Sequence, residues 1–441
     1  MRPYHAAVSE IVTRNGGRTG IAALVAILLL GLGLRAGEAW DGRSPVYDAQ
    51  AYATIAANLE RGEGFTLGPG ATQPASNYSP GLPLFTGGVY ALTGGIHERL
   101  ARVVLALIGT LAVLFAYLIG RRLSGQLAGL IGAGIVAIYP ALLEYQGMLM
   151  SEPLAASLLS GAVLAMLWAD RPRNRGVGAR SWLVPGLLLG ALALTRPEYL
   201  AISLPVAVVV FARRGRDEWQ SCLVQALVML VGLAVVVVPW TVRNAVTLDR
   251  FVPISTGGGQ VLFAGSYLPS GGNPERVGEE VLKRHPELRQ ELPLDPRLEQ
   301  ILMALAHQRY PNMEADAALA RIGRERLWED VSERPGEYIG FLATKLSLIW
   351  GHGPRRVMHQ PLWAALHWVL LALGLLGLAV LAFQRRWEAL LLATILLAAT
   401  AIGLLLVASP RRALVTIPLV AALAGVGATA CRDSLARRWQ G

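Results

Sequence analysis

The chain has 441 residues, of which 54% are hydrophobic and only 16% are charged, and its formal net charge is +10. Charged residues make up about 25% of a soluble globular domain, so the composition excludes an ordinary soluble protein. Apolar runs recur near the length of about 20 residues that crosses a bilayer core. The sequence therefore predicts an all-α polytopic membrane protein. Its positive charge is mostly arginine, which indicates basic cytoplasmic loops rather than nucleic-acid binding.

Ten apolar segments are predicted to span the membrane, at residues 20–36, 99–119, 126–142, 149–169, 182–195, 198–212, 221–240, 362–383, 388–408 and 413–430. Placing the N-terminus in the cytoplasm puts the short arginine clusters there too, in agreement with the positive-inside rule. Arg411 and Arg412 are the exception, because they fall outside. Either this pair has a function there or the last helical hairpin is misplaced. We expect a multi-pass protein of the cell membrane with cytoplasmic N- and C-termini.

Two connecting segments, 37–98 and 241–361, are much longer than the others, and both are predicted to be extracytoplasmic. Loops of this length are often functional. The first contains Asp48, which would share one stripe of a helix with Tyr52 and Leu59. A charge at the start of an apolar face is costly to bury without a partner. Asp48 is therefore either a catalytic acid or base at the membrane surface, or a helix cap that accepts backbone N–H groups.

A second apolar stretch follows in the same loop and ends near Leu92. It is too short to span the membrane comfortably and is flanked by Gly and Pro residues. We predict a second helix that lies in the membrane interface. The alternative is a re-entrant hydrophobic plug that has no chemical role.

Three further charged residues are predicted near the outer surface. Glu144 and Glu152 lie between the third and fourth spans, two helical turns apart. Glu152 begins a span, where a helix N-terminus favours a carboxylate; the functional alternative is an acidic group that faces one cavity together with Asp48. Arg196 joins two short spans and so lies at or below the outer interface. A buried arginine normally pairs with a carboxylate or a phosphate.

The second long loop begins with Pro239-Trp240 and then Arg243-Asn244. Charged, Pro-punctuated helices over about 274–335 are predicted to form a small solvated cap. An interfacial helix is predicted at 338–350, and Lys345 lies in its apolar stripe. Lysine in such a stripe either extends its amine to the interface, which is the commoner outcome, or meets an anion.

One outer face thus collects carboxylates and cations, and this combination indicates a chemistry. Arg and Lys side chains hold a phosphate and stabilise it as a leaving group, while a carboxylate takes a proton from an attacking hydroxyl. Nucleotide sugars and ATP are cytoplasmic, so the phosphate would belong to a lipid. The sequence contains no Walker motif, no His/Glu metal pair and no Gly-x-Ser-x-Gly elbow. Cys222 and Cys431 support neither a disulfide nor a zinc site, and we expect no metal or other cofactor.

Several short motifs, taken in order, resemble a known superfamily. The chain resembles GT-C glycosyltransferases of the dolichyl-phosphate-mannose protein mannosyltransferase type (family 39), and is also similar to the bacterial aminoarabinose transferase of lipid A. The resemblance covers nearly the whole chain. The motifs are Asp-x3-Tyr-x3-Ala from Asp48, Gly62-x-Gly64-Phe65, Ser79-Pro80-x-Leu82-Pro83-Leu84, Met150-Ser151-Glu152-Pro153, Thr195-Arg196-Pro197, Pro239-Trp240-x2-Arg243-Asn244 and Pro410-Arg411-Arg412.

The resemblance implies a fold, a reaction and roles for individual residues. The implied fold is a GT-C-type bundle, here of about ten transmembrane helices, with interfacial helices in two long extracytoplasmic loops. The implied enzyme is an inverting hexosyl- or pentosyltransferase that moves a sugar from a polyprenyl-phosphate donor to a glycan, lipid or protein acceptor outside the membrane. Asp48 would be the general base, and Glu152 would position donor or acceptor. Candidates for binding the donor phosphate or substrate are Tyr52, Glu144, Arg196, Arg243, Asn244, Lys345, Arg411 and Arg412.

The chain also departs from the family pattern. Many relatives have an acidic pair at the catalytic position, whereas Ala49 follows Asp48 here. Ser79 stands where some relatives have a Lys, and the final Arg-Tyr of the pattern is Arg411-Arg412. Two alternatives to the enzyme therefore stay open: a polytopic lipid or sugar transporter, and a non-catalytic protein that binds polyprenyl phosphate. In each case residues 1–441 are expected to form one integral membrane domain with a small outer cap.

Overall fold

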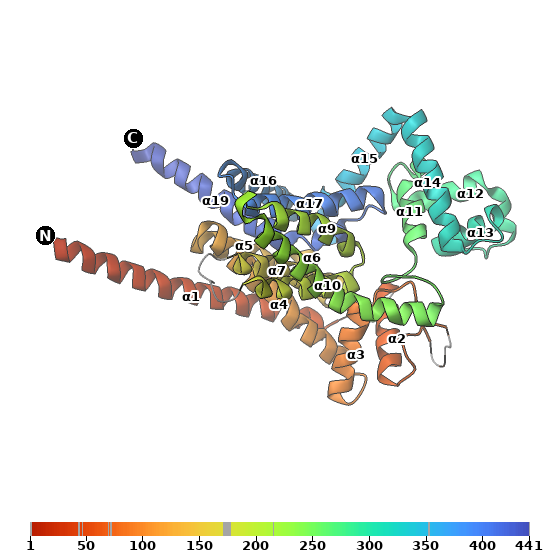
Figure 1. Cartoon of the computed structure of the whole chain (residues 1–441), viewed down its shortest axis with the longest axis horizontal. Helices are drawn as coiled ribbons and strands as arrows, with labels where there is room; N and C mark the ends of the chain where they lie inside the picture. Colours follow the sequence, from red (N-terminus) through yellow and green to blue (C-terminus); the bar gives the residue numbers. More distant parts are fainter. Residues whose placement is uncertain are drawn as a thin grey trace.

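The computed structural model describes residues 2–440 except 43, 44, 46, 69, 71, 72, 171–177, 215 and 352, with side chains from 18 to 437 apart from 216. The regular secondary structure of the described chain is helical. Its only β pairing is an isolated bridge between Thr66 and Pro74. In Figure 1 the bundle helices run along the long axis, with both termini at one end and the outer loops at the other.

Seven described helices are long and apolar enough to cross a membrane. They are α1 (Arg2–Trp40, spanning from Arg18), α4 (Glu98–Ser124), α7 (Ser151–Ala169), α10 (Trp219–Leu248), α16 (Pro361–Phe383), α17 (Trp387–Leu405) and α19 (Ile417–Gln440). The bent pair of α5 (Gln126–Ile138) and α6 (Pro140–Gln146) could form an eighth span. Two apolar helices are shorter: α8 (Leu183–Thr195), preceded by the 3-10 turn η1 (Ala179–Trp182), and α9 (Glu198–Ala212).

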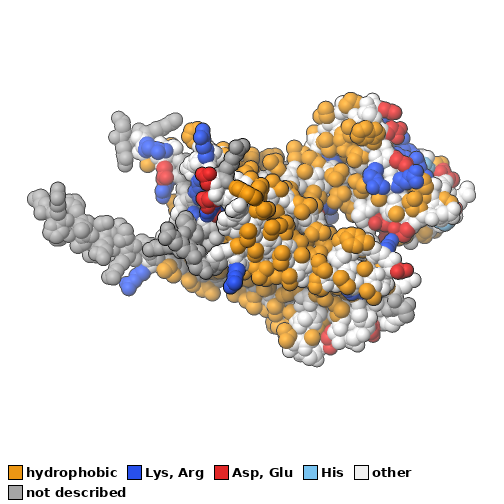
Figure 2. Space-filling view, in the orientation of Figure 1, with side chains coloured by type: hydrophobic (Ala, Val, Ile, Leu, Met, Phe, Trp, Pro, Cys, Tyr) orange, Lys and Arg blue, Asp and Glu red, His pale blue; other side chains and the backbone are white. Residues whose placement is uncertain are grey.

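Each of the ten predicted spans coincides with one of these elements, so the all-α multi-pass architecture is confirmed. The count of ten stays a prediction, because seven or eight of the described elements meet the length requirement. Figure 2 shows the hydrophobic surface expected for such a protein: apolar side chains cover the middle of the bundle, and charged groups gather toward its two ends.

The third predicted span is broken by 51° between α5 and α6. Pro140 has no N–H, so it cannot bond the carbonyl of Val136. The guanidinium of Arg35, buried on α1, donates to the oxygens of Val136 and Ala137 at 2.8 and 3.1 Å. A cation at the C-terminus of a helix is also favoured by the helix dipole. Arg35 therefore stabilises the break.

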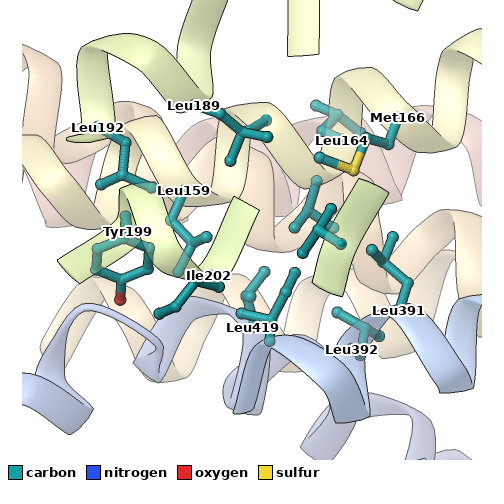
Figure 3. Close-up of a cluster of buried hydrophobic side chains, with 14 of the residues drawn as sticks. Leu159, Leu164, Met166, Leu189, Leu192, Tyr199, Ile202, Leu391, Leu392 and Leu419 are labelled. Atoms are coloured by element: carbon teal, nitrogen blue, oxygen red, sulfur yellow. The ribbon is translucent and has the colours of Figure 1, made fainter. Parts of the chain in front are cut away.

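The core of the bundle surrounds α7, which is the most deeply buried span. Figure 3 shows its side chains meeting those of α8, α9, α17 and α19; the labelled residues are Leu159, Leu164, Met166, Leu189, Leu192, Tyr199, Ile202, Leu391, Leu392 and Leu419. Glycines let α16 and α19 approach closely, because a Cβ on Gly377 would lie 2.0 Å from the carbonyl oxygen of Leu423. The packing of α7 against its neighbours positions its N-terminal end, which carries Glu152.

The outer end of the molecule is built from shorter helices. They are α2 (Asp48–Glu60), α3 (Gly81–Thr93), α11 (Gly258–Ser266), α12 (Val277–Arg284), α13 (Leu298–Arg309), α14 (Ala315–Glu333), α15 (Pro335–Trp350) and α18 (Pro410–Leu414), with the 3-10 turns η3 (Leu268–Ser270), η4 (Pro274–Arg276), η5 (Pro286–Gln290) and η6 (Arg356–His359); η2 (Arg216–Glu218) lies between α9 and α10. Helices α11–α14 pack around their own apolar cluster, which includes Phe263, Val281 and Leu302. They form the cap at the end of the molecule opposite the termini (Figure 1).

Candidate active site

Six charged side chains form one continuous ion-pair network at the outer end of the bundle. Asp48 is the first residue of α2, and Glu152 lies in the first turn of α7. Arg196 and Glu198 lie where α8 ends and α9 begins. Arg411 and Arg412 belong to α18. Residues separated by more than 360 positions in the sequence thus meet at one site.

The network alternates in charge along its length. Arg411 donates from Nη1 to Oδ2 of Asp48 at 3.1 Å and from Nε to Oε1 of Glu152 at 2.6 Å. Arg196 donates to the same Glu152 oxygen at 3.3 Å and to Oε1 of Glu198 at 3.0 Å. Arg412 closes the series with a 3.1 Å bond to Glu198. Three carboxylates therefore neutralise three guanidinium groups.

Glu152 is the buried centre of this network. Its side chain has no exposed surface, and its Oε1 accepts from two arginines. Its Oε2 is buried and has no hydrogen-bond partner among the described residues. A buried carboxylate without its cations costs several kcal/mol, so Glu152 and the two arginines depend on one another for their positions.

Local structure orients the two arginines of α18. Pro410 occupies the first turn, where its missing N–H costs nothing, and the hydroxyl of Ser409 accepts from the N–H of Arg411 at 3.3 Å. Arg412 also donates from Nε to the carbonyl oxygen of Val407 at 2.9 Å. These bonds fix the short helix so that consecutive arginines reach two different glutamates.

Five of the six network residues, all except the buried Glu152, line a cavity of about 320 Å³. Its wall includes Tyr52, Tyr78 and Ser79 from the first loop, together with Val261 and Val407. The rings of Tyr52 and Tyr78 meet edge to face, with centroids 5.8 Å apart. Burial and the negative charges of Asp48 and Glu152 raise the pKa of Tyr52, so its hydroxyl keeps its proton and can donate to a bound molecule.

Asp48 is the most accessible carboxylate of the network, with 46% of its side chain exposed. Its Oδ2 is held by Arg411, and its Oδ1 accepts no hydrogen bond from the described part of the chain. Burial lowers the pKa of Arg411, but the charges of Glu152 and Asp48 outweigh burial and raise it. Arg411 therefore stays charged beside Asp48. In the described structure no side chain accepts a hydrogen bond from the backbone N–H groups at the start of α2, so Asp48 does not cap this helix.

Glu144 lies beside this cavity but does not line it. It forms an ion pair with Arg355. The ring of Tyr145 connects the two regions, because the guanidinium carbons of Arg355 and Arg411 lie 5.7 and 5.8 Å from its centroid. Glu144 is therefore a neighbour of the network, with a separate cation as its partner.

Two further predicted binding residues, Arg243 and Asn244, lie away from the cavity. Arg243 contacts the rings of Phe65 and Trp240 and donates to Oδ1 of Asn244 at 3.0 Å. Asn244 is buried and donates to the carbonyls at positions 252 and 254, at 3.1 and 2.9 Å. Asn244 therefore holds the segment after α10 in place, and Arg243 supports the Asn244 amide. The structure does not bring them to the cavity.

Lys345 neither extends its amine to the interface nor meets a carboxylate in the described structure. Its side chain is 1% exposed, and Nζ donates to the carbonyls of Gly265, Leu404 and Leu406. An ammonium group has three N–H donors, so all three are used. Lys345 thus joins α15 to α11 and to the end of α17. Its amine makes a structural contact in place of either expected alternative, a position at the interface or a contact with an anion.

Sequence reasoning assigned no role to Glu198, which holds two of the three arginines. The signal available was its position two residues after Arg196 across Pro197, in the first turn of a short apolar helix. A carboxylate there can also be explained by the helix N-terminus alone. Among the described residues, no group of three His, Cys, Asp or Glu side chains could hold a metal ion.

Comparison with known proteins agrees with this fold. Residues 76–241 match the dolichyl-phosphate-mannose-protein mannosyltransferase family. No curated protein matches the chain in sequence. The archaeal oligosaccharyltransferase AglB from Archaeoglobus fulgidus, in complex with an inhibitory peptide and a dolichol-phosphate, superposes with a TM-score of 0.59 at 18% identity, covering 96% of this chain. An Archaeoglobus fulgidus oligosaccharyltransferase in the apo form gives 0.59, also at 18% identity and with 96% of this chain covered.

The chain spans about half the length of these oligosaccharyltransferases, 51% and 52%. ArnT from Cupriavidus metallidurans bound to undecaprenyl phosphate gives a TM-score of 0.45 at 16% identity, covering 91% of this chain and 76% of that one. The protein is thus a multi-pass membrane protein with a GT-C fold. The resemblance to the GT-C superfamily seen in the sequence is confirmed by the match over residues 76–241 and by the fold.

Proposed function

We propose that the protein is an inverting glycosyltransferase that moves a sugar from a polyprenyl-phosphate donor to an acceptor on the extracytoplasmic face of the membrane. One observation carries this proposal: an accessible carboxylate, Asp48, lines the same cavity as the guanidinium groups of Arg196, Arg411 and Arg412. A base for the acceptor and a binding site for a phosphate leaving group are therefore a few ångströms apart.

The three arginines retain donors for an anion. Their Nε and Nη1 atoms make the bonds of the network, whereas Nη2 of each has no partner among the described residues. Guanidinium groups bind phosphate through paired N–H donors. Glu152 and Glu198 would position these groups before the donor arrives, and such preorganised charge is effective where a leaving group develops negative charge.

The reaction is a direct displacement. The acceptor hydroxyl oxygen attacks the anomeric carbon and forms the new glycosidic bond, while the bond from that carbon to the phosphate oxygen breaks. Asp48 takes the hydroxyl proton, through its Oδ1, and polyprenyl phosphate leaves with the electron pair. A single displacement inverts the anomeric centre. The arginines supply the positive charge beside the phosphate, so the scheme requires no metal or other cofactor.

The position of the cavity supports a lipid-linked donor. The network lies at the end of the bundle opposite both termini, and the arginine clusters between spans predict that the termini are cytoplasmic. Nucleotide sugars would then be absent from this side. The similarly folded AglB is described in complex with a dolichol-phosphate, which agrees with a polyprenyl phosphate as the carrier here. The acceptor would be a glycan, a lipid or a protein.

The test is sugar transfer by the purified protein in nanodiscs. A panel of radiolabelled polyprenyl-phosphate sugars is compared with nucleotide sugars, using membrane extracts as a source of acceptor. We expect transfer from at least one polyprenyl-phosphate sugar, none from nucleotide sugars, and a product of inverted anomeric configuration. Donor movement across proteoliposomes without cleavage would instead establish the transporter. Tight binding of polyprenyl phosphate with no cleavage of any donor would establish the non-catalytic binding protein.

A further inference from the structure

A second, independent cavity opens at the end of the bundle that carries the termini. It has a volume of about 920 Å³ and lies between the last turn of α9, the last turns of α16 and the first turns of α17. Arg386 places it at this end, because it donates to the carbonyl of Leu123 at 2.7 Å and the next residue, Ser124, bonds Thr429 of α19 at 3.0 Å. The groove therefore lies at the opposite end of the bundle from Asp48.

The floor of the groove is apolar and belongs to the lipid-facing surface of the bundle. Leu375, Ala379 and Ala382 contribute from α16, and Leu390 and Ala393 from α17. Leu375 is 68% exposed and Leu390 51% exposed in the described structure. A surface of this kind at membrane depth is covered by an acyl chain when no protein covers it.

The rim of the groove carries excess positive charge. Arg386 pairs with Glu388 at 2.9 Å, but Arg122 uses the same carboxylate at 3.9 Å. At the end of α9 the guanidinium of Arg213 pairs with Asp170, a carboxylate that Arg214 also uses at 3.0 Å while it pairs with Glu218 as well. Glu388 and Asp170 therefore each serve two arginines.

Arg385 adds a further cation with no carboxylate partner among the described residues. It occupies the turn between α16 and α17 with a left-handed φ of 54°. This conformation is uncommon for a residue other than glycine, and it places the side chain on the groove wall. Trp387 follows on the same wall, and tryptophan is enriched at the level of lipid headgroups.

We propose that this groove binds an anionic glycerophospholipid of the cytoplasmic leaflet. Its phosphate would lie against Arg385 and Arg386, and one acyl chain would lie along Leu375, Ala379 and Leu390. Basic pockets between spans on the cytoplasmic side recognise anionic headgroups in this way. The inference rests on the groove and on the predicted cytoplasmic position of the termini, and it does not depend on the proposed glycosyl transfer.

Native mass spectrometry of the full-length protein in mild detergent tests the headgroup. Phosphatidylglycerol and phosphatidylcholine are titrated separately. We expect wild type to prefer phosphatidylglycerol, and Arg385→Gln to bind it about fivefold more weakly, the effect of one cation at a membrane surface. Arg432→Gln is the matched control, because Arg432 is an exposed arginine of α19 at the same end. Equal binding of both lipids by wild type, or equal losses in both variants, would overturn the proposal.

A second variant tests the groove without changing any charge. Ala382→Trp fills the floor and should reduce phosphatidylglycerol binding as much as Arg385→Gln does, whereas Leu366→Trp, at the other end of α16, should not. Full binding by Ala382→Trp would show that the lipid lies elsewhere and would overturn the assignment. Undecaprenyl phosphate is titrated in parallel. If it binds more tightly than phosphatidylglycerol and is lost in Ala382→Trp, the groove takes the carrier lipid and the phospholipid assignment is wrong.

Discussion

Glu198 holds Arg196 and Arg412 against the cavity through one oxygen atom. Replacing it with Gln removes the charge but keeps the size of the side chain, so both arginines lose their common anchor. We expect kcat to fall about 10- to 100-fold, the typical cost of misplaced groups in an active site. Donor affinity should not weaken, because Arg412 is left without a carboxylate and Arg196 keeps only Glu152, so both cations can still meet the phosphate. Steady-state kinetics measures kcat, and donor titration measures donor affinity. Weaker donor binding at an unchanged kcat would contradict this role.

Lys345 is assigned a structural role, because its amine bonds three carbonyl oxygens. Lys345→Met leaves these buried oxygens without donors, which costs about 1–3 kcal/mol for each unsatisfied group. We expect a clearly lower midpoint of thermal unfolding. The folded fraction should bind polyprenyl phosphate with wild-type affinity. Lost phosphate binding at unchanged stability would return Lys345 to the phosphate site.

Some positions of individual residues could be predicted from the sequence, and others could not. Hydropathy and the positive-inside rule predict depth along the membrane normal, and this placed Asp48, Glu152 and Arg196 at one outer face. They do not predict the angle at which a side chain leaves the bundle. In the structure Lys345 is directed at carbonyl groups and Arg243 at aromatic rings. Tertiary contacts decide the direction in which each of these side chains points.

At the scale of elements, the break between α5 and α6 depends on a residue from another helix. Arg35→Met removes the donors for the carbonyl of Ala137 and for that of Val136, which Pro140 cannot bond within the helix. We expect the midpoint of thermal unfolding to drop by at least about 4 °C. Arg18→Met is the control, since Arg18 is exposed near the other end of the same span. Equal midpoints for the two variants would show that the break is stable without Arg35.

This break also explains a difference between the predicted and observed elements. The apolar run at 126–142 predicts one span, and Tyr139-Pro140 is compatible with either a kink or a helix end. The structure ends α5 at Ile138 and begins α6 at Pro140. Arg35, 101 positions earlier than Val136, supplies the missing donors, and no local pattern in the sequence identifies such a partner. Long, strongly apolar spans were predictable, whereas breaks that depend on distant side chains were not.

At the scale of the whole molecule, the orientation in the membrane remains a prediction that a cysteine can test. Cys431 is exposed near the end of α19, and Cys222 is buried. A membrane-impermeant maleimide should label Cys431 in inside-out vesicles but not in intact cells. Leu294→Cys, in the exposed cap, should show the opposite pattern and serves as the control. Labelling of Cys431 in intact cells would place the cavity on the cytoplasmic side and contradict the proposed donor.

In the proposed mechanism one carboxylate, Asp48, at a phosphate-binding cavity performs the proton transfer. The most direct test measures single-turnover sugar transfer by Asp48→Asn in nanodiscs, with polyprenyl-phosphate binding measured on the same samples. Asp249→Asn is the matched control, because Asp249 is an exposed residue at the end of α10 whose left-handed conformation Asn also adopts. We predict that transfer by Asp48→Asn falls about 10²- to 10⁴-fold while lipid binding and the control stay at wild-type levels. Full transfer by Asp48→Asn would contradict the assignment of the base and with it the mechanism.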